Sequence, residues 1–353
     1  MILTSEEKQQ YDRHLILNEI GAVGQLRLKS AKVLVIGAGG LGCPVLQYLT
    51  AAGIGTIGVI DDDKVDQSNL QRQILYTHND IGKFKAEVAI EKLTSLNPFV
   101  NFEVYLHRLN SENAINLFSK YDIIVDGSDN FPTRYLVNDA AVLTEKPVVF
   151  GSIFKFEGQV SVFNYKNGPT YRCLYPSPPN SEDVPNCSDI GVLGVLPGII
   201  GAFQANEVLK IVLEIGNVLS GKLLTYNALS MQQLTLNFHK NIHNQVLNLE
   251  SSYEVFCGFS ADKIDEIVFE EFIKNKNAFN LLDVREDFER SSFHIGGIHI
   301  PLGELHTRIS EIPQNKDLVV YCKAGFRSKK AIEILSKSFK KQLLNLKNGL
   351  VNS

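Results

Sequence analysis

The stretch Lys32–Gly42, KVLVIGAGGLG, decides the fold of the first two-thirds of the chain. The β-branched run at Lys32–Ile36 is typical of a short buried strand, and apolar residues at helical spacing follow the glycines. Gly37, Gly39 and Gly42 match the spacing G-x-G-x-x-G. These glycines let the backbone approach phosphate groups, and the helix that follows offers unpaired N–H groups to them. The stretch therefore predicts a strand, a nucleotide-binding turn and a helix.

Further buried strands follow this turn along the chain. The helix after the turn is expected to end near Ala52, and Thr56–Ile60 (TIGVI) predicts a second strand that leads into Asp61. Asp122–Val125 and Pro147–Phe150 have the same apolar character. Strands that alternate with helices predict a doubly wound α/β fold, in which Asp61 lies where a ribose-binding carboxylate belongs. An adenine nucleotide is the predicted ligand.

Composition limits the class of protein. The chain has 353 residues, 44% of them hydrophobic and 21% charged, with a net charge of −4. This length predicts two or three folded domains. The chain lacks the basic excess of a general nucleic-acid binder, so we expect no nucleic-acid partner. A small molecule or a protein is the expected partner.

Cysteine usage and the apolar segments bear on the compartment. Five cysteines without tight spacing argue against a disulfide framework and for a reducing compartment. Met1–Leu15 has no basic start followed by an apolar run, which predicts no secretory signal. Gly191–Phe203 is interrupted by glycine and proline and is too short to span a bilayer. The expectation is a cytoplasmic protein with no membrane partner.

The chain divides into two predicted domains. Residues 1–245 form the nucleotide-binding domain, and residues 246–260 form a linker in a region rich in Asn, Gln and Ser. Residues 261–353 form a smaller α/β domain, with strands near Phe279–Leu282 and Leu318–Tyr321.

Charged residues favour ATP over NAD as the nucleotide. A triphosphate that expels pyrophosphate needs more positive charge around it than a dinucleotide does. Arg13 in YDRH, Arg72 in SNLQRQ and Lys85 in IGKFKAE are the candidate cations, and Asp129 in DGSDN is the candidate magnesium ligand. An NAD-dependent oxidoreductase remains the alternative from a different class.

Five segments together resemble the MoeB/ThiF/HesA family, the bacterial relatives of ubiquitin-activating enzymes, over about residues 5–230. They are YDRH, GAGGLG, SNLQRQ, DGSDN and GSIFKFEGQVSVF. The resemblance implies a Rossmann-like domain that uses ATP and magnesium to adenylate the C-terminal Gly-Gly carboxylate of a small ubiquitin-like sulfur-carrier protein. It also implies a homodimer, in which Arg13 reaches into the partner's site. The residues that it implies for the nucleotide are Gly37, Gly39, Gly40, Gly42, Asp61, Ser68, Asn69, Arg72, Lys85, Asp129 and Asn130.

The adenylation chemistry requires no general base. The incoming carboxylate is already an anion, so catalysis consists of orientation and charge neutralisation. We therefore assign no histidine a catalytic role.

The cysteines depart from the family pattern. The family usually carries a zinc site of two C-x-x-C pairs, but here Thr170 precedes Cys173 and Glu254 precedes Cys257 at the corresponding positions. Two thiolates do not complete a tetrahedral zinc site, so no zinc is expected. Cys187 resembles the family's crossover-loop cysteine, which is a candidate for a covalent link to the activated carrier.

A second candidate site lies in VVYCKAGFRS, residues 319–328. A buried strand delivers Cys322 into a short loop that closes on Arg327 and a helix. Backbone N–H groups, the helix N-terminus and Arg327 would stabilise a thiolate there. Phosphatases and sulfurtransferases both use this arrangement. Four residues lie between Cys322 and Arg327, whereas the loop of cysteine-based phosphatases, which this one resembles, has five. The loop length favours sulfur transfer.

The residues around this loop resemble the rhodanese domain over about residues 261–353. Asp283–Glu286 (DVRE) and His294–Pro301 (HIGGIHIP) carry the resemblance. It implies that Cys322 holds a persulfide, filled by an upstream donor such as a cysteine desulfurase.

Together the two sites predict one reaction sequence. The carrier's terminal glycine is adenylated, and the Cys322 persulfide then supplies sulfur to form a thiocarboxylate. Molybdopterin biosynthesis is the expected pathway, and the thiamine-thiazole carrier is the alternative with the same chemistry. A non-catalytic adaptor that binds the carrier is a further alternative.

Overall fold

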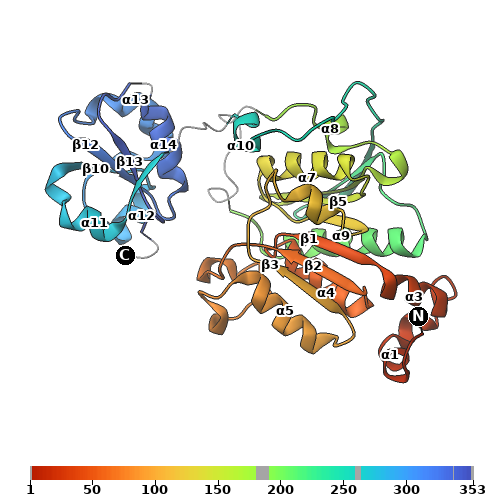
Figure 1. Ribbon diagram of the computed structural model, residues 1–353. Coiled ribbons are helices and arrows are strands. Elements are labelled where there is room, and N and C mark those ends of the chain that lie inside the picture. The colour runs from red at the N-terminus through yellow and green to blue at the C-terminus, as the bar shows by residue number, and fades with distance from the viewer. Residues whose placement is uncertain (1, 180–190, 259–263, 337, 351–353) are drawn as a thin grey trace. The chain divides into compact units, whose positions relative to one another are not determined.

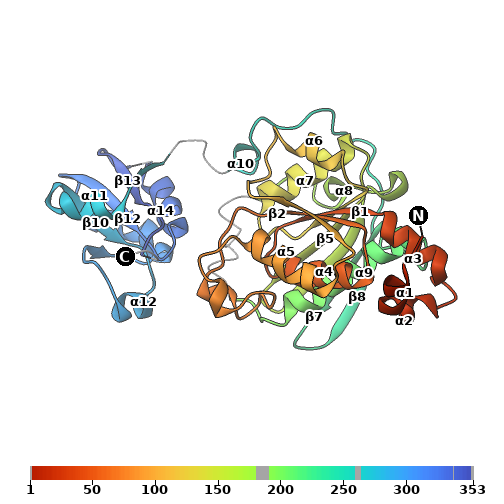
Figure 2. The ribbon, with the colours of Figure 1, turned by 60° about the horizontal axis from the view of Figure 1, so that its bottom comes forward.

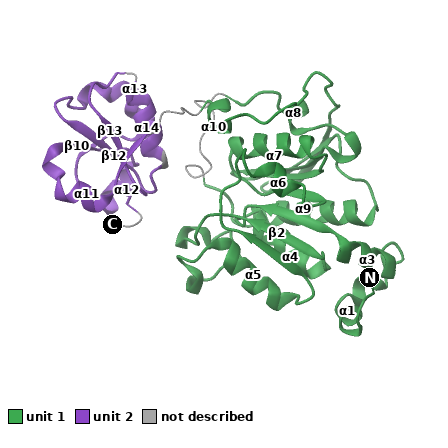
Figure 3. Ribbon diagram, in the orientation of Figure 1, with its two compact units in different colours: residues 1–259 green, residues 260–353 purple. Residues whose placement is uncertain are grey.

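The computed structural model describes residues 2–179, 191–258, 264–336 and 338–350. The chain divides into two compact units, residues 1–259 and 260–353 (Figure 3). Each unit has its own sheet and its own buried core.

Unit 1 is built on an eight-stranded sheet in the order β3-β2-β1-β4-β5-β6-β7-β8. The first five strands of this order are parallel, and β6, β7 and β8 continue the sheet in antiparallel fashion. The strands are β1 Lys32–Ile36, β2 Thr56–Ile60, β3 Asn101–Tyr105, β4 Ile123–Asp126, β5 Val148–Phe154, β6 Glu157–Phe163, β7 Lys222–Asn227 and β8 Gln232–Asn237.

Helices cover both faces of this sheet (Figures 1 and 2). Helices α4, α5 and α9 pack in one apolar cluster, and α6, α7 and α10 pack in another on the opposite face. The helices of unit 1 are α1 Ser5–Gln10, α2 Asp12–Leu15, α3 Gly21–Ser30, α4 Gly42–Ala52, α5 Lys85–Leu96, α6 Ala114–Phe118, α7 Phe131–Leu143, α8 Tyr171–Leu174, α9 Leu196–Leu213 and α10 Tyr253–Phe256.

Strands β1 and β4 lie side by side where the strand order reverses. All four residues of β4 are buried, as are four of the five residues of β1. Such continuous apolar runs fit parallel strands covered on both faces. In a doubly wound sheet, ligands bind outside the carboxyl ends of the strands at this reversal. The predicted doubly wound fold is confirmed, and its binding crevice lies after β1 and β4.

Helix α9 is long and apolar enough to cross a membrane by length and composition. Half of that segment is buried, and the helix packs against α4, β5 and β6. It carries the buried polar residues Gln204 and Glu207, and Gln204 donates from Nε2 to the backbone oxygen of Asp126 at 2.8 Å. These contacts make α9 a core helix of unit 1.

The region that we predicted as a linker is partly folded onto unit 1. Helix α10 lies within residues 246–260, and Tyr253 and Cys257 are buried in the core against α7. Tyr253 donates its hydroxyl to Asp139, which also accepts two hydrogen bonds from Arg172, both at 2.7 Å. The polar composition of this region gave no sign of these contacts, because the partner of Tyr253, Asp139, lies 114 positions away in the sequence.

Unit 2 is a five-stranded parallel sheet in the order β11-β10-β12-β13-β9. Its predicted strands, near 279–282 and 318–321, are β10 and β12 at the centre of the sheet. The elements are β9 Asp265–Ile267, α11 Phe269–Lys274, β10 Phe279–Asp283, α12 Asp287–Ser292, β11 Ile298–His299, α13 Leu305–Arg308, β12 Asp317–Tyr321, α14 Phe326–Ser336 and β13 Leu343–Leu346.

The buried network of Asp139 gives a stability prediction. Asp139→Asn is expected to destabilise unit 1 by about 3 kcal/mol or more, because it leaves Arg172 largely buried without a counter-charge. Tyr253→Phe removes one hydrogen bond and should cost about 1–2 kcal/mol. Differential scanning calorimetry of the full chain measures both as shifts of the unit 1 transition. Glu214→Gln, in an exposed pair with Arg27 of the same unit, is the control and should cost less than about 1 kcal/mol. An Asp139→Asn protein as stable as wild type would contradict this role.

Candidate functional site

The glycine turn after β1 packs directly against the turn after β4. Gly37 has a φ of +86°, and a Cβ there would lie 3.1 Å from the backbone oxygen of Gly127. A Cβ on Gly42 would lie 2.0 Å from the backbone oxygen of Gly37. A side chain at Gly37 would press on the turn after β4, and one at Gly42 would clash within the glycine turn itself. Gly39 and Gly40 lie between Gly37 and Gly42, just before helix α4 begins. The first N–H groups of a helix lack partners within the helix.

Asp61 braces this turn from the end of β2. Its Oδ2 accepts the N–H of Ala38 at 2.7 Å, and its Oδ1 accepts the N–H of Asp63 at 2.8 Å. Burial raises the pKa of the Asp61 carboxyl, and the charge of Lys85 opposes that rise. Lys85 is buried, and its ammonium pairs with Asp63 at 2.8 Å. The predicted carboxylate and cation are thus neighbours at the carboxyl edge.

The SNLQRQ segment, residues 68–73, begins on the short helix η1, Gln67–Asn69, and continues beyond it. Asp66 caps this helix by accepting from the N–H and the hydroxyl of Ser68 at 2.8 and 2.5 Å. Asn69 accepts the N–H of Asp66 through its side chain, and Arg72 donates to the backbone oxygen of Ser68 at 3.0 Å. These local bonds fix the segment that carries Ser68, Asn69 and Arg72.

The DGSDN segment leaves the end of β4. Asp126 is fully buried, and burial raises the pKa of its carboxyl. Asp129 is exposed, and Asn130 caps α7 by accepting the N–H of Thr133 at 3.0 Å. Asp129 is therefore held at a fixed point between the strand and a capped helix, next to the glycine turn.

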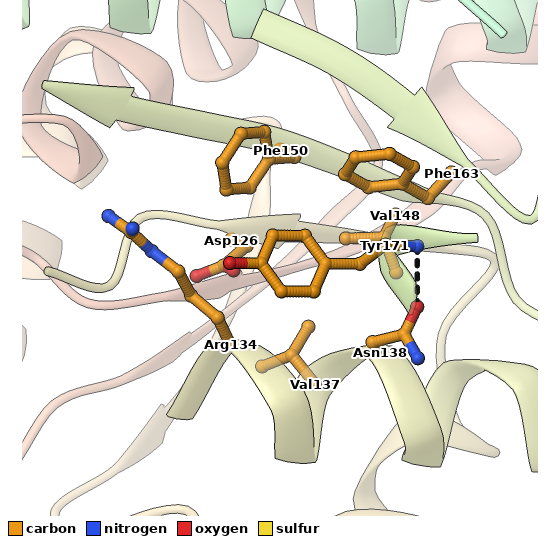
Figure 4. A pocket seen from close by; sticks show the side chains of 8 residues that line it. All are labelled: Asp126, Arg134, Val137, Asn138, Val148, Phe150, Phe163 and Tyr171. Carbon is orange, nitrogen blue, oxygen red and sulfur yellow. Dashed lines mark hydrogen bonds between the residues drawn. The ribbon is translucent and has the colours of Figure 1, made fainter. Parts of the chain in front are cut away.

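Three polar side chains that we did not single out from the sequence also lie in this region. Among the described residues, buried atoms without a hydrogen-bond partner include Gln73 Oε1, Ser128 Oγ and Arg134 Nε. Arg134 and Asp126 line a small cavity, with the ring of Tyr171 extending toward Asp126 (Figure 4). Gln73 and Arg134 could have been found from the sequence, because they stand at the ends of the segments SNLQRQ and DGSDNFPTR.

The chemistry of this edge fits a nucleoside triphosphate. The first-turn N–H groups of α4 suit phosphate oxygens. Lys85 supplies a buried cation, and the unpaired atoms of Gln73 and Ser128 are polar groups that a ligand would satisfy. ATP therefore fits the site better than an apolar ligand does.

Arg13 lies at the other edge of the sheet. It is exposed on α2, two residues after Tyr11. The hydroxyl of Tyr11 accepts from Asn97 at the end of α5, and its ring packs under Gly53 at the end of α4. Both helix ends precede parallel strands, so this is the amino edge. Within one chain, Arg13 is not brought to the glycine turn.

Three cysteines of unit 1, Cys43, Cys173 and Cys257, lie among the described residues. The sulfur of Cys173 accepts the N–H groups of Thr170 and Asn241 at 3.4 and 3.3 Å. Burial raises the pKa of Cys257 to about 12 and that of Cys43 to about 12. Cys187 lies outside the described residues.

In unit 2, Cys322 follows β12 and starts the loop that leads into α14. Its sulfur accepts the N–H of Gly325 at 3.1 Å and lies 3.4 Å from the hydroxyl of Ser328. Leu350 donates its N–H to the backbone oxygen of Lys323 at 2.9 Å, and a Cβ on Gly349 would lie 2.4 Å from the backbone oxygen of Cys322. The loop therefore cradles a buried sulfur and is backed by the end of the chain.

Arg327 closes this loop, but a carboxylate that we did not predict engages its guanidinium. Arg327 donates to Glu289 on α12 through two hydrogen bonds, of 2.5 and 2.7 Å. Behind the loop, Ser328 donates to Asn345, whose amide donates to Glu266. These partners come from distant segments, so loop spacing alone gave no signal for them.

Comparisons with known proteins agree with this geometry. Residues 11–247 match the ThiF family, and residues 268–352 match the rhodanese-like domain. The chain is 41% identical over 366 residues to the "Probable adenylyltransferase/sulfurtransferase MoeZ" of Mycobacterium tuberculosis, covering 99% of this chain and 93% of that protein. It is 52% identical over 266 residues to the "Sulfur carrier protein adenylyltransferase" of Thermus thermophilus, covering 72% of this chain and 98% of that protein.

A relative in Porphyra purpurea, "Probable molybdopterin-synthase adenylyltransferase", is 43% identical over 360 residues, covering 98% of this chain and 92% of its own length. The crystal structure of Escherichia coli MccB matches with a TM-score of 0.60 and 22% identity, over 69% of this chain and 75% of MccB, and this likeness shows the fold alone. The match to the ThiF family favours ATP over the NAD alternative. The chain is therefore a member of the ThiF family of ATP-using adenylyltransferases with a C-terminal rhodanese-like domain, an adenylyltransferase and sulfurtransferase.

Proposed function

We propose that unit 1 adenylates the C-terminal glycine of a small ubiquitin-like sulfur carrier and that unit 2 supplies sulfur from a Cys322 persulfide, in the cytoplasm and for molybdopterin biosynthesis. The observation that carries the proposal is the meeting of the glycine turn, Lys85 and the DGSDN segment at one sheet edge of unit 1, in a chain whose second unit cradles a buried cysteine sulfur. The names of the Thermus and Porphyra relatives support the carrier and the pathway. The thiamine-thiazole carrier would require the same chemistry.

Adenylation at this edge is a displacement at phosphorus. An oxygen of the carrier's terminal carboxylate attacks the α-phosphorus of ATP, and the bond to pyrophosphate breaks. Lys85 and Arg72 neutralise the phosphates as charge shifts to the leaving pyrophosphate. Asp129 is the residue that would hold magnesium, which neutralises phosphate charge when bound. Arg134, with its buried unpaired Nε, is the cation that we assign to the carrier's carboxylate.

Sulfur transfer then uses the thiol of unit 2. A cysteine desulfurase persulfide gives its terminal sulfur to the Cys322 thiolate, and the donor cysteine leaves as a thiolate. The Cys322 persulfide attacks the acyl-adenylate carbonyl and AMP leaves, which joins the carrier to Cys322 through an acyl disulfide. A second thiol then takes the Cys322 sulfur into a disulfide and releases the thiocarboxylate. Cys187 is our candidate for that thiol, and an external dithiol would reduce the resulting disulfide.

A homodimer would complete the nucleotide site. Arg13 lies at the amino edge of its own sheet, whereas the glycine turn lies at the carboxyl edge. For Arg13 to serve this reaction, it must therefore reach the nucleotide site of a second copy of the chain. This placement supports the predicted exchange of Arg13 between subunits.

Lys85→Ala is expected to reduce ATP–pyrophosphate exchange at least about 100-fold, because a buried cation at the phosphates is lost. Exchange is measured with a carrier that ends in Gly-Gly, and a carrier that lacks the terminal glycine should give none. Lys83→Ala is the matched control, since Lys83 is an exposed lysine on the same segment that pairs with Asp80. Full exchange in Lys85→Ala, or the absence of carrier-dependent exchange in wild type, would overturn the adenylation proposal and leave the adaptor alternative.

Mixing two inactive proteins tests the exchange of Arg13. Arg13→Ala and Lys85→Ala dimers should each be inactive, and after subunit exchange each mixed dimer should contain one complete site. Exchange activity should therefore return on mixing. If Arg13 acts within its own chain, no mixed dimer contains a complete site and activity stays absent.

Cys322→Ala should abolish thiocarboxylate formation and leave ATP–pyrophosphate exchange unchanged, because the two reactions use different units. Mass spectrometry of the carrier and of the enzyme, loaded with sulfur by a cysteine desulfurase, measures both persulfide and thiocarboxylate. Cys173→Ala is the control thiol. Persulfide on a protein that lacks Cys322, with undiminished thiocarboxylate, would remove Cys322 from the mechanism.

A further inference from the structure

The arginines around the Cys322 loop are paired with carboxylates in the described part of unit 2. Arg285 and Arg290 both contact Asp283, at 2.8 and 3.3 Å. Arg327, the residue that closes the loop, is bound by Glu289. The guanidinium charge of Arg327 is therefore matched by a negative charge before any donor arrives.

The Arg327–Glu289 pair is well shielded and geometrically strong. Two parallel N–H···O bonds join the guanidinium and the carboxylate, and the side chains are only 15% and 16% exposed. Two-pronged pairs of this kind are the stronger class of charged hydrogen bonds. Lys323 lies on the same loop but is exposed, where solvent and salt screen its charge.

Glu289 is itself held in place from α12. It occupies the third position of that helix, where its carboxylate accepts the N–H of Glu286 at 3.1 Å. The hydrogen bond from Arg327 lowers the pKa of Glu289, so the side chain is a carboxylate at neutral pH. Both members of the pair are therefore charged at neutral pH, and Glu289 is anchored by its own helix.

Sulfur donors differ in how much positive charge they need at this loop, where Arg327 and Glu289 form a pair with no net charge. Thiosulfate is a small dianion, and sulfite leaves from it with the bonding electrons and full charge. Both the dianion and its leaving group need an unpaired cation at the loop. A protein persulfide brings one sulfur at the end of a side chain and leaves behind a single thiolate, which the donor's own site stabilises.

We propose that Glu289 sets the donor specificity of the Cys322 loop, disfavouring small dianionic donors such as thiosulfate and favouring a persulfide on a partner protein. This inference rests on the proposed sulfurtransferase function. With thiosulfate, the Cys322 thiolate attacks the outer sulfur, the S–S bond breaks and sulfite leaves. With a persulfide, the same attack on the terminal sulfur releases the donor thiolate. The two reactions differ in the anion that must be bound.

Glu289→Gln in the full chain tests the proposal. The neutral amide removes the negative charge that faces Arg327, so kcat/KM for thiosulfate, with cyanide as acceptor, should rise about tenfold or more, mainly through a lower KM. Transfer from the persulfide of N-acetylcysteine methyl ester should change less than about threefold. Glu311→Gln is the matched control, because Glu311 accepts two hydrogen bonds from Arg308 in an exposed pair of the same unit.

Two further variants separate specificity from a general disturbance of the loop. Glu289→Asp keeps the charge and should not raise thiosulfate activity. Adding Arg327→Ala to Glu289→Gln should remove the gain. A Glu289→Gln protein that is folded by circular dichroism and active with the persulfide, but shows no gain with thiosulfate, would overturn the inference alone. Wild type that fails to take sulfur from either donor would overturn the proposed function instead.

Discussion

The close approach of two backbone turns organises the nucleotide site. Gly42 leaves no room for a Cβ, Gly37 has a φ of +86°, and the turn after β1 rests against the turn after β4. This contact exists because β1 and β4 are neighbours in a parallel sheet whose order reverses there. Asp61 then ties the glycine turn to the end of β2. The other candidate residues occupy positions around this fixed backbone.

The two units handle negative charge in different ways. Unit 1 presents helix N–H groups, buried Lys85 and unpaired polar atoms, which together suit a triphosphate. In unit 2 the sulfur of Cys322 accepts the backbone N–H of Gly325, and the loop arginine is already bound by Glu289. One site is therefore arranged for a highly charged substrate. The other is arranged for a sulfur atom delivered with little charge.

A buried ion pair anchors the end of unit 1 where the family usually carries metal-binding cysteines. Arg172 and Tyr253 converge on Asp139, and the ring of Phe256 lies 4.7 Å from the Arg172 guanidinium carbon. These side chains join α7, α8 and α10. Ion pairing and aromatic packing thus hold together segments that are distant in the chain.

The sequence by itself determined the elements whose signal is local. The apolar runs of β1, β2, β10 and β12, the glycine turn and the strand-loop-helix around Cys322 follow from residue order, because strand burial and turn geometry depend on neighbouring residues. Only the tertiary structure decided which charges meet. Lys85 with Asp63 spans 22 positions, Arg327 with Glu289 spans 38, and Asp139 with Tyr253 spans 114. The tertiary structure also showed that Arg13 lies at the amino ends of the parallel strands, whereas the glycine turn lies at their carboxyl ends. Which long polar side chains pair depends on how the chain folds, so the spacing of these residues in the sequence does not predict the pairs.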